Sequence, residues 1–88
     1  MRKTIYSDSQ KSLLRLLREA RESQGVTQVE LALRLGQTQS FVSKCERGER
    51  RLDAIELWHF CRAMGHPFQV LMAQLDATLL VIERNGRE

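Results

Sequence analysis

Residues 37–51, with the sequence QTQSFVSKCERGERR, combine two kinds of chemistry in one short string. Amide and hydroxyl side chains open the string, and arginines close it. Amides and hydroxyls donate and accept hydrogen bonds, whereas a guanidinium group only donates and always carries a positive charge. The string therefore offers directional hydrogen bonding beside an anion-binding surface.

Positive charge is concentrated in the first part of the chain. The 88 residues carry a formal net charge of +3. Residues 1–51 contribute +5, from eleven Lys and Arg against six Asp and Glu, and residues 52–88 contribute −2, from three against five. This asymmetry predicts one face that meets a polyanion and another end with a different role. From charge alone, the alternative is that these residues serve only to keep the protein soluble.

Few residues suit catalysis or a bound metal. Ser43, Cys45 and His59 are the nucleophile and base candidates, and no phosphate-cradling or oxyanion loop accompanies them, so we predict no enzymatic activity. The cysteines and histidines lack the close spacing of a zinc site, so we predict no metal and no cofactor. The N-terminal residues lack an apolar leader, and the longest apolar run, Leu79–Ile82, is far too short to span a bilayer. These features favour a cytoplasmic protein with reduced thiols and no membrane partner.

Helical periodicity runs through the chain and predicts an all-α fold. The expected helices cover residues 8–24, 28–35, 39–47 and 54–64, with a fifth from residue 67. Ser, Thr or Asp precedes each of the first four as an N-cap, and a glycine follows each of these four. The expected inward residues of the first helix are Leu13, Leu14, Leu17 and Ala20. We assign residues 1–76 to a single domain.

The C-terminal residues 77–88 form a tail whose structure the pattern leaves open. Leu79–Ile82 favour a strand by propensity, yet Leu75, Leu79 and Ile82 would also continue a helical stripe. The surplus apolar residues near this end are candidates for a homodimer interface, or else they close the core of the monomer. These candidates are Val70, Leu75, Leu79, Leu80, Val81 and Ile82.

Two consecutive stretches, TQVELALRLG at residues 27–36 and QTQSFVSKCERGER at residues 37–50, place Ala32 where two helices approach and Gly36 in the turn between them. With the flanks REARESQG and LDAIELWHFCRAMGHPFQVLM, this pattern resembles the helix-turn-helix of the Xre/Cro/phage-repressor family. The resemblance covers about residues 13–72. Cys45 is a departure, because larger aliphatic side chains are usual there. The resemblance implies a five-helix, lambda-repressor-like DNA-binding domain.

The resemblance also implies roles for single residues, because the third helix of such a motif enters the major groove. The implied base-reading residues are Thr38, Gln39, Ser40, Ser43 and Lys44. A Gln amide can pair with adenine, and the Lys44 ammonium can reach guanine or a phosphate. The implied phosphate-binding residues are Gln28, Arg47, Arg50 and Arg51. Arg21 and Glu46 would form a structural ion pair beneath the third helix, and Phe41 either contacts DNA or packs on a neighbouring helix.

The expected function is that of a sequence-specific double-stranded DNA-binding transcriptional regulator. We expect a repressor that acts as a homodimer on a palindromic operator, with half-sites about 34–36 Å apart. The alternative is an antitoxin-type protein-interaction module. Such a module would bind a toxin partner through the C-terminal tail and autoregulate its own promoter.

Overall fold

The computed structural model describes residues 7–86, which form five helices and contain no strand. The helices are α1 (Asp8–Ser23), α2 (Gln28–Leu35), α3 (Gln39–Glu46), α4 (Ala54–Met64) and α5 (Phe68–Arg84). The predicted all-α fold is confirmed. α1 and α3 each end one residue earlier than predicted, because Gln24 and Arg47 are their C-caps, and Pro67 precedes α5 as its N-cap.

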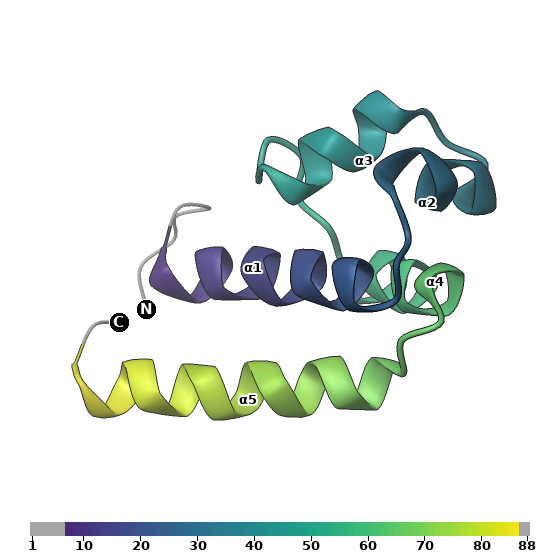
Figure 1. The fold of residues 1–88 in the computed structure, drawn as a ribbon. Helices are drawn as coiled ribbons and strands as arrows, with labels where there is room; N and C mark the ends of the chain where they lie inside the picture. The colour runs from purple at the N-terminus through teal and green to yellow at the C-terminus, as the bar shows by residue number, and fades with distance from the viewer. Residues whose placement is uncertain (1–6, 87–88) are drawn as a thin grey trace.

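The helices are arranged around α1. Figure 1 shows α1 and α5 running antiparallel side by side, with α2 and α3 on the opposite side of α1 from α5. α4 packs against both α2 and α5 and so closes one end of the molecule. The Arg34 guanidinium of α2 donates a 2.8 Å hydrogen bond to the Ala63 carbonyl of α4, which ties these two helices together. α3 packs directly against α2 and α1.

Every helix contributes a fully buried side chain to one shared core. These side chains include Leu17, Leu31, Val42, Met64 and Leu71. The inward face of α1 differs from the prediction, because its buried residues are Leu16, Leu17, Ala20 and Arg21. Leu13 and Leu14 are only half-buried, since α1 packs against α3 on one side and α5 on the other. The apolar pattern alone did not indicate that the buried face of α1 includes Arg21.

α5 is continuous across the predicted boundary between residues 76 and 77. The residues that had suggested a strand, Leu79–Ile82, are helical. Leu71 and Ile82 are buried, and Leu75 packs partly against the core, so the helical stripe extends to the end of the helix. Packing of this stripe against α1 therefore outweighs the strand propensity of the individual residues. Residues 77–84 are the last part of α5, which begins at Phe68.

Two turn glycines border α3. Gly36 ends α2 with φ +68, and Gly48 follows α3 with φ +80, both in the left-handed region that glycine adopts at little cost. Their surroundings differ. A Cβ at Gly48 would lie 2.9 Å from the Leu14 Cδ1 of α1, whereas a Cβ at Gly36 would meet nothing within 4 Å. Gly48 thus allows the end of α3 to approach α1 closely.

We predict that Gly48→Ala destabilises the fold more than Gly36→Ala. Each substitution places Ala in the left-handed region, at a cost of about 1–2 kcal/mol. Gly48→Ala adds the displacement of Leu14, which at a partly exposed site we expect to cost about 1 kcal/mol more. Urea unfolding of both variants measures the difference. Equal losses of unfolding free energy would show that Leu14 moves aside without cost.

Candidate nucleic-acid interface

α3 has one apolar face and one polar face. Thr38 caps the helix, with its hydroxyl accepting a 3.1 Å hydrogen bond from the Phe41 amide. Val42 and Cys45 are fully buried against the core. The sequence-predicted base-reading residues lie on the remaining surface: Thr38, Gln39, Ser40 and Lys44 are exposed, and Ser43 is half-buried. The structure therefore brings all five predicted residues onto one short, accessible helix.

A chain of hydrogen bonds connects the first residue of α3 to the interior. The Gln39 Nε2 donates to the Gln28 Oε1 at 2.8 Å, and the Gln28 Nε2 donates to the Glu46 Oε1 at 3.0 Å. Gln28 opens α2, so this chain joins the N-termini of the two helices of the motif. Gln28 is predicted from the sequence to bind phosphate, and no motif indicated this bridge. The hydrogen bond to Gln28 therefore holds the side-chain amide of Gln39 in the free protein.

Arg21 and Glu46 form a buried ion pair between α1 and α3, as the resemblance implied. The Arg21 Nε lies 2.6 Å from the Glu46 Oε2, and the Arg21 NH2 group lies 3.1 Å from the Glu46 Oε1. Their side chains are only 9% and 4% exposed. A third guanidinium nitrogen donates to the Val26 carbonyl at 2.8 Å. The hydrogen bond that Arg21 donates to Glu46 raises the pKa of Arg21, so its guanidinium group stays charged.

The arginines that follow α3 differ in their partners. The Arg47 Nε donates to the Glu49 carboxylate at 2.7 Å, and a second guanidinium nitrogen donates to the Ser43 hydroxyl. The NH2 group of Arg50 lies 2.8 Å from the Glu56 carboxylate of α4. Each arginine lowers the pKa of its acidic partner, Glu49 or Glu56, chiefly through this hydrogen bond.

Arg51 is the predicted phosphate-binding residue with the most accessible charge. Its side chain is exposed and has no hydrogen-bond or ion-pair partner among residues 7–86. The sequence did not indicate that the acidic residues near this loop contact the arginines. Glu56 follows Asp53 by three residues, and this spacing indicated only a capping box, which is also present. Its second contact, with Arg50, depends on how the loop folds back.

Phe41 packs within the protein. It is half-buried and lies partly against the core, with its ring centroid 6.3 Å from that of Phe60 in α4. The Arg50 guanidinium carbon lies over the Phe41 ring, 4.8 Å from its centroid. The sequence had left open whether Phe41 contacts DNA or a neighbouring helix. In the free protein it contacts α4 and the loop after α3.

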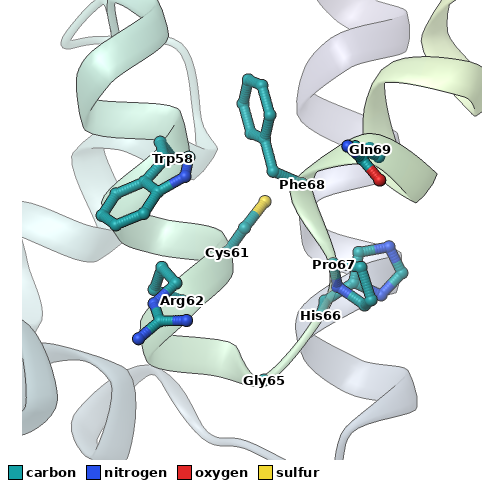
Figure 2. Close-up of a pocket in the computed structure, with 8 residues that line it drawn as sticks. All are labelled: Trp58, Cys61, Arg62, Gly65, His66, Pro67, Phe68 and Gln69. Carbon is teal, nitrogen blue, oxygen red and sulfur yellow. The ribbon is translucent and has the colours of Figure 1, made fainter.

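A cleft of about 510 Å³ lies at the turn between α4 and α5, as Figure 2 shows. Trp58, Arg62 and Phe68 are among its lining residues, and none of the residues predicted to contact DNA lines it. The Cys61 sulfur points from α4 towards Phe68. Burial raises the pKa of the Cys61 thiol to about 11, so the thiol stays protonated at neutral pH. A protonated thiol is a poor nucleophile, and this cleft is separate from the surface of α3.

Between residues 7 and 86, no group of three or more His, Cys, Asp or Glu side chains is arranged to hold a metal ion. None of the five helices in this part is long and apolar enough to cross a membrane.

α2 and α3, joined by a three-residue turn that contains a left-handed glycine, define a helix-turn-helix. A family model described as Helix-turn-helix matches residues 17–71. The chain is 54% identical to an XRE-family like protein from Pseudomonas syringae pv. tomato str. DC3000, with a TM-score of 0.73, over 77% of this chain and 83% of that one. A crystal structure of the clp gene regulator ClgR from C. glutamicum is 26% identical, with a TM-score of 0.69, over 77% of this chain and 88% of that one. A comparison with curated proteins gave no match.

The chain therefore belongs to the Xre family of helix-turn-helix proteins. As a member of this family it is a DNA-binding regulator of transcription. The family match includes α2, α3 and the ion pair beneath them, so it rests on the same residues as the geometry described above.

We predict that Arg21→Ala lowers the free energy of unfolding by about 3–5 kcal/mol, because Glu46 is left as an unpaired buried charge. Arg18→Ala is the matched control. Arg18 pairs with Glu22 on the exposed side of α1 at 3.3 Å, and removal of such a surface pair costs about 0–1 kcal/mol. Urea unfolding of the two variants decides the matter. If both lose the same small amount, the Arg21–Glu46 pair does not hold α3 on α1.

Proposed function

We propose that the protein is a repressor that acts as a homodimer and reads a palindromic operator with α3. The observation that carries the proposal is the exposed polar face of α3, which is fixed from beneath by a buried ion pair. A recognition helix must present hydrogen-bonding side chains at its N-terminal end in a defined orientation. The repressor role rests on the helix-turn-helix itself, because occupation of an operator is the simplest way for such a domain to act.

Gln39 is the residue best prepared to read a base. One hydrogen of its Nε2 is donated to Gln28, which leaves a second hydrogen and the Oε1 atom for a partner. A donor and an acceptor side by side match the N7 and N6 positions of adenine. Ser40 lies next to Gln39, and Lys44 lies one turn further along the same face. Thr38 and Ser43 border this surface and complete the proposed reading set.

The proposed phosphate contacts surround the reading set. The guanidinium group of Arg51, at the edge of α3, has no partner among residues 7–86, and Arg47 is held by an exposed pair with Glu49 and a hydrogen bond to the Ser43 hydroxyl. An exposed pair of this kind is worth about 0–1 kcal/mol, so Arg47 can exchange Glu49 for a phosphate at little cost. Gln28 opens α2, where the backbone amides of a helix N-terminus suit a phosphate. These contacts would set the register of α3 without reading sequence.

The outer face of α5 is the proposed dimer surface. Val70, Leu80 and Val81 remain 44–50% exposed, whereas Ile82 is buried and Leu75 and Leu79 are half-buried within one chain. At 3.6 residues per turn, Val70 and Val81 fall on one side of the helix, with the exposed Ala77 between them. A second copy of the chain would cover this stripe. A toxin-like protein partner is the alternative occupant, because the same apolar face would suit either.

Selection of bound duplexes from a random DNA pool, at two salt concentrations, tests the proposal. We expect a palindrome to be enriched, with half-sites about 34–36 Å apart and an affinity that falls steeply with salt. A dilution series followed by light scattering measures the dimer directly. A pool with no enriched sequence would exclude sequence reading. A monomer at high micromolar concentration would exclude the homodimer and favour a different protein on α5.

We predict that Lys44→Ala relaxes the base preference at one position of each half-site. The expected loss is about 1–3 kcal/mol of discrimination if the ammonium contacts a base edge. Lys11→Ala removes the same charge from α1, where Lys11 borders a shallow hollow that Ile82 of α5 also lines. Repetition of the selection with both variants compares them. If both variants keep the wild-type preference and differ only in overall affinity, Lys44 is a phosphate contact instead.

A further inference from the structure

Arg50 joins the recognition helix to α4. It lies in the loop between these helices, and its backbone amide donates to the Lys44 carbonyl at 3.3 Å, which keeps the loop against the end of α3. Its side chain is 43% exposed and contacts residues of both neighbouring helices. The guanidinium carbon lies 4.8 Å from the centroid of the Phe41 ring, and the NH2 group lies 2.8 Å from the Glu56 Oε2.

Phe41 is well placed to set the orientation of α3. It is the third residue of the helix and lies between Ser40 and Lys44, two of the proposed base-reading residues. Phe60 contacts the ring from α4, and Arg50 contacts it from the loop. A cation over an aromatic face is attracted to it. These contacts anchor the first turn of α3 to α4 and to the loop through the Phe41 ring.

Glu56 fixes Arg50 in this position. Its Oε1 accepts a 3.0 Å hydrogen bond from the Asp53 amide at the start of α4, and its Oε2 receives Arg50. The carboxylate therefore cannot follow the guanidinium to another site without breaking the cap of α4. The charge of Arg50 is also neutralised locally by Glu56. A phosphate that approached Arg50 would meet a carboxylate beside it, which weakens the attraction.

We propose that Arg50 is a positioning residue for sequence recognition, which sets the orientation of α3 through Phe41 and Glu56 and does not bind phosphate. This assignment rests on the proposed function and replaces the phosphate-binding role expected from the sequence. Its neighbour Arg51 offers the contrast. Arg51 belongs to the same loop, and its side chain has no partner among the residues that the structure describes.

The test uses three single variants, Arg50→Gln, Glu56→Gln and Arg51→Gln, together with the double variant of Arg50 and Glu56. Affinities for the selected duplex and for an unrelated duplex are measured over a range of salt concentrations. Gln keeps an acceptor for the Asp53 amide, and both members of the Arg50–Glu56 pair are partly exposed, so the variants should fold. Urea unfolding confirms folding before affinities are compared. Partial unfolding would weaken binding to both duplexes equally, so the ratio of the two affinities reports on positioning alone.

We expect Arg50→Gln and Glu56→Gln to lower this ratio by about tenfold each, although they change the charge in opposite directions. The double variant should lose no more than either single variant, because the two side chains act together. Neither substitution should change the slope of affinity against salt, whereas Arg51→Gln should reduce its magnitude by about 1.

Three results would overturn the assignment. The first is a salt slope that falls for Arg50→Gln as it does for Arg51→Gln, which would make Arg50 a phosphate ligand. The second is a Glu56→Gln variant that binds both duplexes more tightly, because release of Arg50 would then serve binding. The third is an unchanged affinity ratio in both Arg50→Gln and Glu56→Gln. A wild-type chain that shows no preference for any duplex would instead refute the proposed function itself.

Discussion

The buried ion pair between Arg21 and Glu46 is the interaction on which the position of α3 depends. Two charges removed from water are costly unless each is fully paired and hydrogen-bonded. Here the carboxylate receives two nitrogens from Arg21 and one from Gln28, and the guanidinium also reaches the Val26 carbonyl. Any sliding or rotation of α3 relative to α1 would separate these groups. The pair therefore contributes a defined geometry more than it contributes stability.

The same carboxylate links the interior to the outer face of α3. From Glu46 the hydrogen bonds continue through Gln28 to Gln39, the first residue of the helix. Side chains at the surface usually lose entropy when they bind a partner, and a side chain that is already held loses less. In this domain the buried pair and the exposed amide belong to one network, so the core and the candidate reading surface cannot be adjusted independently.

Net charge gives an incomplete description of the surface around α3. The loop after α3 carries three arginines, yet two of them are paired with Glu49 and Glu56. Because of these acidic partners, the three arginines differ in how readily their charge could meet a phosphate. Arg47 has an exposed partner that it can exchange, Arg50 is held between an aromatic ring and a capping carboxylate, and Arg51 is free among the described residues. A count of positive residues would treat all three alike.

The first four helices, their N-caps and the helix-turn-helix could be predicted from the sequence, because these depend on residues within a few positions of one another. Thr27 with Glu30, and Gly36 in its left-handed turn, are examples of such local chemistry. The tertiary structure decided which side chains meet across helices. Arg50 meets Phe41 and Glu56 because the loop folds back, and Leu79–Ile82 are helical because α5 packs along α1. Local propensity is set by short-range sterics and hydrogen bonds, whereas these pairings depend on how whole helices bury their apolar faces, and no short stretch of sequence contains that information.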